Sequence, residues 1–243
     1  MSLSSIVGTS APPVNEIGTQ DTSEITPRQE FEGHTYWVTG AIHLPYGQRM
    51  MTCSLDGSLR SPLKIWDSKT GELIITLKGH TDPVNHLAWT LDGKTLISGS
   101  DDHSIRTWNT STWTQIAVLQ GHTNIVYAIA ISPNNRILAS ASADNTTRLW
   151  NLDNSKPISS PLRRHGTGAV ACVSFSADEK LLATGCDDQN TYTWDVHAII
   201  RKAGLDDLLL GRDKKSVHII VRDTFHNQEG TTVFLLYGLA RGD

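Results

Sequence analysis

The chain of 243 residues has few cysteines, little net charge and no long hydrophobic run. Its three cysteines, Cys53, Cys172 and Cys186, lack the spacing of a disulfide framework or a zinc site, so we expect a reducing compartment. The net charge of −4 argues against a nucleic-acid scaffold, which normally has a basic face. The longest apolar stretch, Val233 to Leu239, is too short to cross a bilayer, and the N-terminus has no secretory pattern. We therefore expect a cytoplasmic protein that binds neither nucleic acid nor membrane.

Two short markers recur along the chain at a nearly constant period. The first is Gly-His, replaced by Arg-His in the fourth copy; its steps are 46, 42 and 43 residues, and its histidines are His34, His80, His122 and His165. The second is Trp followed by Asp or Asn; its steps are 42, 42 and 44 residues, and its tryptophans are Trp66, Trp108, Trp150 and Trp194. Two markers in phase over four repeats match a propeller blade of four short strands.

The residues between the markers are typical of strands and turns. In the third repeat, Ile125 to Ile131 is rich in β-branched and aromatic residues, and Ser132 to Asn135 then forms a turn. No stretch within the repeats has a sustained helical period. We predict an all-β fold.

These residues resemble the WD-repeat family over roughly Glu30 to Val196. The resemblance implies a β-propeller in which each blade is held by a hydrogen-bonded relay of His, Ser or Thr, Asp and Trp. The four relays so implied are His34, Thr52, Asp56 and Trp66; His80, Ser98, Asp102 and Trp108; His122, Ser140, Asp144 and Trp150; and His165, Thr184, Asp188 and Trp194. The Asp-to-Trp spacing is longer in the first repeat, so we expect its third strand to bulge or start late near Pro62.

A His-Asp-Ser set could also indicate a hydrolase triad, and the pairs Asp101-Asp102 and Asp187-Asp188 could indicate a metal site. We favour structural roles, because the set recurs four times and the second aspartate of each pair already belongs to a relay. Neither GxGxxG nor GxxxxGK[ST] occurs. We expect no catalytic residues, no metal and no cofactor.

The ends of the repeat region differ from its middle. Outer strands are expected at Leu73 to Lys78 and Gln115 to Leu119, whereas Val196 to Ala203 looks helical, and Thr26 to Glu32 is a spare outer-strand candidate that could close the ring. We expect a flexible arm at 1–25, four WD-type blades at 26–196 and a non-repeat extension at 197–243, with strand-like runs at Ser216 to Arg222 and Thr231 to Tyr237. Three architectures stay open: a fragment of a larger ring, half of a dimeric eight-blade ring, or a closed four-blade ring.

Three positions per blade are implied by the resemblance to face the propeller rim, where such proteins dock partners. They are Trp37, Thr39 and Leu55; Pro83, Asn85 and Asp101; Ile125, Tyr127 and Ala143; and Ala169, Ala171 and Asp187. Aromatic and aliphatic residues among them suit the centre of a protein interface. We expect a non-catalytic scaffold that binds a protein or peptide, with a homodimer as one way to complete the ring. The alternatives are a sensor module of a larger signalling protein and a propeller enzyme.

Overall fold

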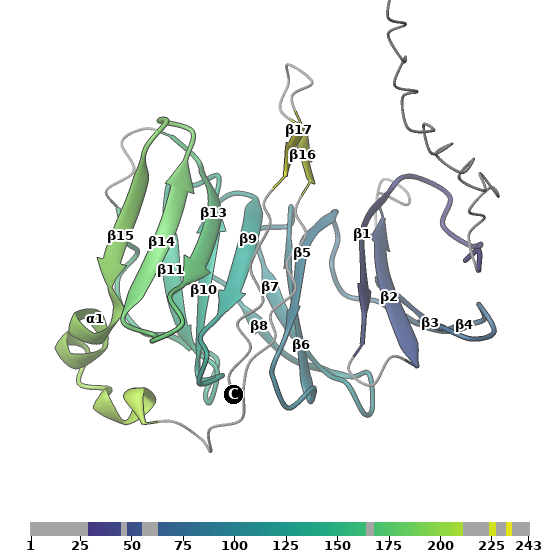
Figure 1. The fold of residues 1–243 in the computed structure, drawn as a ribbon, viewed down its shortest axis with the longest axis horizontal. Coiled ribbons are helices and arrows are strands. Elements are labelled where there is room, and N and C mark those ends of the chain that lie inside the picture. Colours follow the sequence, from purple (N-terminus) through teal and green to yellow (C-terminus); the bar gives the residue numbers. More distant parts are fainter. Residues whose placement is uncertain are drawn as a thin grey trace, which may run out of the picture.

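The computed structural model describes residues 29–44, 48–54, 63–163 and 168–210, and two short strands nearer the C-terminus. These residues form a row of antiparallel sheets in chain order (Figure 1). The first sheet has the order β1-β2-β3-β4, with bounds Val38–His43, Arg49–Ser54, Leu63–Asp67 and Leu73–Leu77. The second has the order β5-β6-β7-β8, with bounds Val84–Trp89, Thr95–Ser100, Ile105–Asn109 and Gln115–Leu119.

The outer strand is short in the third sheet and absent from the described part of the fourth. The third contains β9 to β12, with bounds Val126–Ile131, Ile137–Ser142, Thr147–Asn151 and Lys156–Pro157, so its outer strand has two residues. The fourth contains β13 to β15, with bounds Val170–Phe175, Leu181–Cys186 and Thr191–Asp195. The predicted all-β fold with four WD-type blades is confirmed. In the first blade β3 is described from Leu63, and the expected bulge or late start near Pro62 lies outside the described residues.

One turn conformation recurs between the second and third strands of the last three sheets. In the third sheet, the Asp144 carboxylate accepts a hydrogen bond from the backbone N–H of Thr146 at 3.0 Å. Asn145 between them has a φ of 63°, a left-handed conformation that short polar side chains tolerate. The equivalent residues His103 and Gln189 have φ of 65° and 66°. The aspartate therefore shapes this turn through its own side chain.

The hydrophobic core lies between successive sheets. Three clusters of buried side chains fill the spaces between the first and second, second and third, and third and fourth sheets. The inner strands β1, β5, β9 and β13 are each in contact with the next. The valines that begin β5, β9 and β13 (Val84, Val126 and Val170) are 0% exposed, because the preceding sheet covers each of them. Each sheet is thus stabilised chiefly by its neighbours.

The described residues form no closed ring, since the first and fourth sheets stand at opposite ends of the row (Figure 1). Val38, the equivalent of the three buried valines, is 51% exposed. The expected closing strand at Thr26 to Glu32 is not found in its described part: residues 29–32 belong to no strand. Instead the ring of Phe31 contacts Trp66 of β3 edge-on, at 6.0 Å between centroids. This segment lies against the first blade because it leads directly into His34, which is hydrogen-bonded to Thr52 of that blade.

A helical segment follows the last strand, as expected. The α-helix α1 spans Val196–Lys202, and the Asp195 carboxylate caps it by accepting the N–H of Ala198. The 3-10 helix η1 spans Asp206–Leu209. Val196, Ile200 and Leu208 complete the core between the third and fourth sheets. None of the helices in the described part of the chain is long and apolar enough to span a bilayer.

Polar contacts fasten η1 beneath the third sheet. The Asn134 amide donates to the Leu208 carbonyl at 2.9 Å. The Arg136 guanidinium pairs with Asp153 at 2.6 Å and Asp207 at 3.0 Å and also donates to the Asp207 carbonyl. Farther along, β16 (Thr224–His226) pairs with β17 (Thr232–Phe234). The described strand β17 falls within the run predicted at Thr231 to Tyr237; the rest of that run and the run predicted at residues 216–222 lie outside the described residues.

We predict that the segment ending in η1 contributes to the stability of the repeat region. Leu208→Ala should lower the free energy of unfolding by about 2–5 kcal/mol, since it empties a fully buried site. Leu210→Ala, two residues on and exposed, should change it by less than about 0.5 kcal/mol. Urea denaturation of the two variants makes the comparison. Equal effects would show that η1 is not docked on the sheets.

Candidate functional site

The third sheet holds a complete four-residue relay. The indole N–H of Trp150 donates to Ser140 Oγ at 2.9 Å. Ser140 Oγ lies 2.7 Å from His122 Nε2, and His122 Nδ1 lies 2.8 Å from the Asp144 carboxylate. The same carboxylate also accepts the hydroxyl of Thr146 at 2.6 Å. The relay thus joins the third strand, the second strand, the turn after it and the loop that precedes the first strand.

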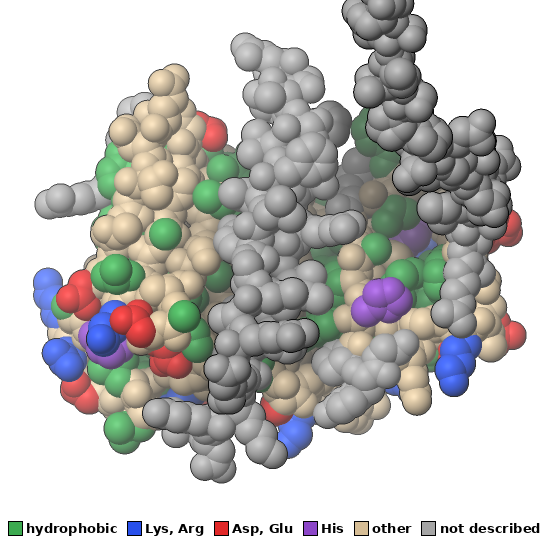
Figure 2. Space-filling model, in the orientation of Figure 1, with side chains coloured by type: hydrophobic (Ala, Val, Ile, Leu, Met, Phe, Trp, Pro, Cys, Tyr) green, Lys and Arg blue, Asp and Glu red, His purple; other side chains and the backbone are tan. Residues whose placement is uncertain are grey.

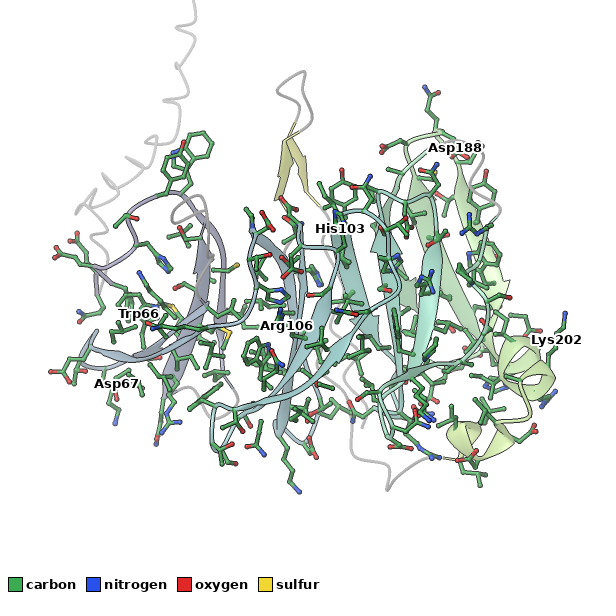
Figure 3. The ribbon with its side chains drawn as sticks, turned by 180° about the vertical axis from the view of Figure 1, so that it is seen from behind. Trp66, Asp67, His103, Arg106, Asp188 and Lys202 are labelled. Atoms are coloured by element: carbon green, nitrogen blue, oxygen red, sulfur yellow. The ribbon has the colours of Figure 1, made fainter. Side chains whose placement is uncertain are left out.

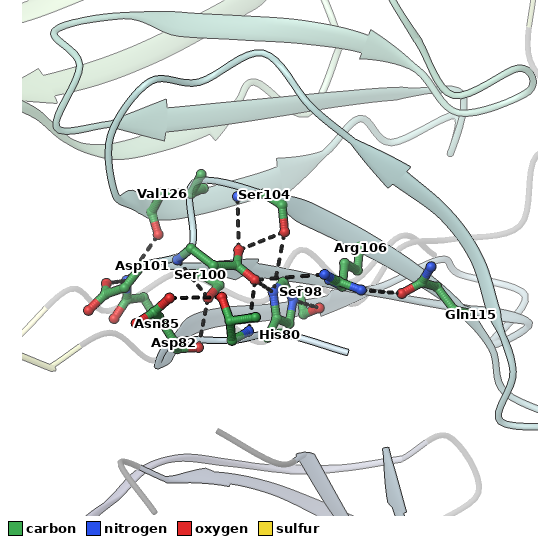
Figure 4. Close-up of polar contacts among 12 residues, drawn as sticks. His80, Asp82, Asn85, Ser98, Ser100, Asp101, Ser104, Arg106, Gln115 and Val126 are labelled. Carbon is green, nitrogen blue, oxygen red and sulfur yellow. Dashed lines mark hydrogen bonds and ion pairs between the residues drawn. The ribbon is translucent and has the colours of Figure 1, made fainter. Parts of the chain in front are cut away.

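The second sheet repeats this arrangement around His80 (Figure 4). The distances from Ser98 Oγ are 3.0 Å to Trp108 Nε1 and 2.7 Å to His80 Nε2, and His80 Nδ1 lies 2.8 Å from Asp102. Because the carboxylate can only accept, Nδ1 carries the proton, and Nε2 then accepts from the serine hydroxyl. The hydrogen bonds of this relay therefore run in one direction, from Trp108 through Ser98 and His80 to Asp102. None of these buried groups lacks a hydrogen-bond partner.

In the first and fourth sheets the structure describes part of each relay. In the first, Thr52 Oγ1 accepts from Trp66 Nε1 at 2.8 Å and lies 2.6 Å from His34 Nε2, while Asp56 lies outside the described residues. In the fourth, Thr184 Oγ1 accepts from Trp194 at 3.0 Å, while His165 lies outside them. Asp188 accepts the phenol of Tyr192 at 2.7 Å, a contact that the repeat pattern did not suggest.

The relay serines are poorly suited to nucleophilic catalysis. Ser98 and Ser140 are fully buried, and the oxygen of each already accepts an indole N–H. A hydrolase serine needs its oxygen open to the substrate carbonyl, so the order Ser-His-Asp alone does not make a triad here. Among the described residues, no group of three or more His, Cys, Asp and Glu side chains is placed to hold a metal ion.

Burial and hydrogen bonding shift the pKa values of the relay groups in a consistent direction. Burial lowers the pKa of His80 and of His122, and it outweighs the neighbouring carboxylate, which acts in the opposite sense. For Asp102 and Asp144, burial alone would raise the pKa. Hydrogen bonds from the histidine and from Ser104 or Thr146 outweigh it and hold both pKa values well below the usual range. The relays therefore contain neutral histidine and ionised aspartate at neutral pH.

The rim positions of the second, third and fourth blades lie at one edge of the row. In each of these blades, the residue before the relay aspartate donates its backbone N–H to the carbonyl of the residue before the first-strand valine. The pairs are Asp101 to Pro83 at 2.8 Å, Ala143 to Ile125 at 2.9 Å and Asp187 to Ala169 at 3.0 Å. Figure 3 shows His103 and Asp188 in the turns at this edge, with Asp67 and Lys202 at the opposite one. We call the edge formed by these turns the upper rim.

The upper-rim positions differ in exposure from blade to blade. Trp37 is 72% exposed and Asp187 is exposed, whereas eight others are half-buried: Pro83, Asn85, Asp101, Ile125, Tyr127, Ala143, Ala169 and Ala171. The side chain of Thr39 and the whole of Leu55 lie outside the described residues. The predicted set therefore lies along one edge in the second, third and fourth blades, and none of its described members is fully buried.

Polar contacts link the second and third blades at this rim. The amide of Asn85 donates to the Asp101 carboxylate at 2.6 Å and to the Val126 carbonyl of the next blade at 3.1 Å. Burial raises the pKa of Asp101, although the Asn85 bond opposes the shift. Burial and then the charges of Asp187 and Asp101 raise the pKa of Tyr127. The Tyr127 phenol thus stays neutral between two acidic side chains.

An exposed aromatic pair begins the first blade. The rings of Tyr36 and Trp37 stack at 5.8 Å between centroids, with 23° between their planes. Tyr36 is exposed like its neighbour, and its carbonyl accepts the Ser54 hydroxyl at 3.1 Å. Tyr36 was not among the predicted rim residues; two adjacent aromatics before a first-strand valine would have been the signal for it.

Comparison with known proteins agrees with this geometry of repeated blades and relays. A family model described as "WD domain, G-beta repeat" matches residues 25–61, 71–109, 113–151 and 155–195. These four matches cover more than half of the chain. Each of the last three begins with the outer strand of one sheet (β4, β8 or β12) and continues through the first three strands of the next sheet. The chain belongs to the WD-repeat family.

Individual relatives align with short parts of the chain. The Lissencephaly-1 homolog of Caenorhabditis briggsae is 44% identical over 68 residues, which are 28% of this chain and 16% of the relative. The Nuclear distribution protein PAC1-2 of Uncinocarpus reesii is 41% identical over 59 residues, 24% and 12% of the two chains. The Periodic tryptophan protein 2 homolog of Caenorhabditis elegans is 31% identical over 74 residues, 30% and 8%. The chain thus matches only a small part of each of these three relatives.

We predict that the relay of the third blade stabilises the fold. Trp150→Phe keeps the aromatic ring and removes the N–H that Ser140 accepts, so the free energy of unfolding should fall by about 1–3 kcal/mol. Trp89→Phe, which makes the same change at a half-buried strand position outside the relays, is the matched control. Thermal and urea denaturation measure both. An unchanged melting temperature for Trp150→Phe would refute a stabilising relay.

The pKa shifts predict how stability depends on pH. The folded-state pKa values of His80 and His122 lie below the usual 6.5, so the unfolded chain binds protons that the folded chain excludes. Stability should be fully present above about pH 6.5 and fall as the pH drops below it. The lowered pKa values of Asp102 and Asp144 should cause a further loss below about pH 4.

Melting temperatures between pH 8 and pH 3 test this expectation. His122→Asn should be less stable at pH 8 and should lose less stability than the wild type between pH 7 and pH 5. A wild-type melting temperature that is constant or rises from pH 7 to pH 5 would show that the buried histidines do not exclude the proton.

Proposed function

We propose that the chain is a non-catalytic scaffold that binds a partner protein or peptide across its upper rim. The observation that carries this proposal is the exposed Tyr36–Trp37 stack at the same edge as the half-buried Tyr127. Tryptophan and tyrosine are enriched among the residues that contribute most to binding energy in protein interfaces. Keeping two aromatic rings exposed to water is unfavourable in free energy, and a bound partner that covered them would remove this penalty.

The rigidity of the rim supports the same function. The backbone bonds at Asp101, Ala143 and Asp187 hold the turns of three blades to the starts of their inner strands. Asn85 links two blades directly. A surface held in one conformation loses little conformational entropy on binding, which favours affinity. Protein rather than nucleic acid is the proposed partner, because the chain has a net charge of −4 and acidic side chains flank Tyr127. A cytoplasmic location is part of the proposal.

The alternative function, a recognition module within a larger signalling protein, would use the same surface. It differs from the scaffold only in that the repeats would be joined to another domain. The relatives' names give no enzymatic activity, and we propose none for this chain. The relay serines argue in the same direction, since their oxygens are buried and occupied.

The rim proposal predicts which side chains partner binding requires. Proteins captured from an extract of the source organism by the wild type should be depleted with Trp37→Ala combined with Tyr127→Ala. The captured partner, once purified, should bind the double variant with a loss of about 2 kcal/mol or more, roughly thirtyfold in Kd. The melting temperature shows whether the variant is folded.

Leu73→Ala combined with Ile116→Ala is the matched control. These exposed apolar side chains lie on the outer strands β4 and β8, away from the upper rim. The control should capture the same proteins as the wild type. A folded rim variant that binds its partner normally would place the binding surface elsewhere.

A further inference from the structure

The two ends of the row expose sheet faces that are buried everywhere else. At the first end, Val38 occupies the position of Val84, Val126 and Val170, which are completely buried by a preceding sheet. Val38 itself is 51% exposed. Ala41, at the position of the buried Leu87, Ile129 and Val173, is exposed as well. This face of the first sheet is the one that each later sheet turns toward its predecessor, and we call it the leading face.

The fourth sheet exposes the opposite kind of face. Thr191, the first residue of β15, is exposed, whereas Ile105 and Thr147 at the same place in β7 and β11 are 0% exposed. Thr193 is also exposed, and its equivalents Thr107 and Leu149 are buried. This is the face that each earlier sheet turns toward its successor, and we call it the trailing face.

The exposed trailing face has the features of the buried ones. At the interface between the second and third sheets, Val126 packs so closely over Gly99 that a Cβ there would lie 2.8 Å from Val126 Cγ1. Gly185 has the same place in the fourth sheet, since it pairs with Cys172 as Gly99 pairs with His86. Thr147 and Thr107 show that threonines at these strand positions are compatible with burial between blades.

The charge distribution also suits burial of this face. In Figure 2 the surface over β13, β14 and β15 consists mostly of backbone and uncharged, non-hydrophobic side chains, with separate hydrophobic patches. Charged side chains gather below it, around α1. Burying uncharged side chains avoids the large desolvation cost of burying ions.

We propose that a second copy of this chain packs its leading face on the trailing face, with Val38 over Gly185, and that two copies close head to tail into an eight-blade ring. In such a pair each copy contributes both faces, so both exposed faces are covered at once. Each new interface continues the packing that already joins three pairs of sheets within one chain. Head-to-tail contacts end in a closed ring only when the rotation allows it, and eight blades is within the range of known propellers.

The solution mass of the intact chain tests the proposal directly. Light scattering and sedimentation should give twice the chain mass of 26.7 kDa. Val38→Asp and Thr191→Lys, one on each face, should each weaken dimerisation at least tenfold while the melting transition stays cooperative. Ile116→Lys places a charge on the exposed outer strand β8 and should leave the mass unchanged.

Mixing the two variants determines the direction of packing. An equimolar mixture of Val38→Asp and Thr191→Lys should recover dimers, because one interface joins two unmodified faces and the other places the new carboxylate near the new ammonium. Three results would overturn the proposal: a monomer at all concentrations, a mass that grows with concentration beyond two chains, or a dimer sensitive to one variant alone. These experiments measure the mass of the assembly, whereas the rim variants Trp37→Ala and Tyr127→Ala measure binding of a partner protein, so failure of the ring and failure of the scaffold proposal can be distinguished.

Discussion

Burial of apolar side chains between successive sheets is the interaction on which the rest of this structure depends. A sheet of three or four short strands has two faces, and one such sheet alone leaves too much apolar surface in water to be stable. Here the second and third sheets are covered on both faces, and each contributes side chains to two clusters. Stability is therefore shared along the row, as in other repeat proteins in which each unit contacts its neighbours.

The relays solve a problem that this packing creates. The loop before each inner strand and the turn after the second strand must end at the same edge, where the sheets offer little apolar surface to hold them. A buried chain of Trp, Ser, His and Asp ties both segments to the blade through directional bonds, as in the third sheet. Because these groups are desolvated, losing one partner costs more than the bond would contribute in water. The upper rim is held in place by interactions formed inside the blades.

The fold could be predicted from the sequence because its markers have structural causes. Gly-His and Trp-Asp recur at fixed spacing since each blade needs the same relay, and the turn residues recur since Asn145 and its equivalents adopt the same left-handed conformation. The helix after Asp195 was also predictable, from its apolar spacing. Interactions between distant segments were not: Phe31 contacts Trp66 of its own blade, and Arg136 binds Asp207 across 71 positions. No local pattern encodes such pairings.

The candidate site shows the same division between local and distant information. The repeat assigns equivalent positions in all four blades, yet Trp37 is exposed while Ile125, its equivalent, is half-buried. Equivalence in the sequence fixes where a residue sits within its blade; exposure depends on what stands beside that blade. Ile125 has a described blade on each side, and Trp37 has one on a single side (Figure 1). The aromatic pair that most favours partner binding is therefore prominent for the same reason that Val38 is exposed: both lie at the end of the row, where the packing that buries their equivalents stops.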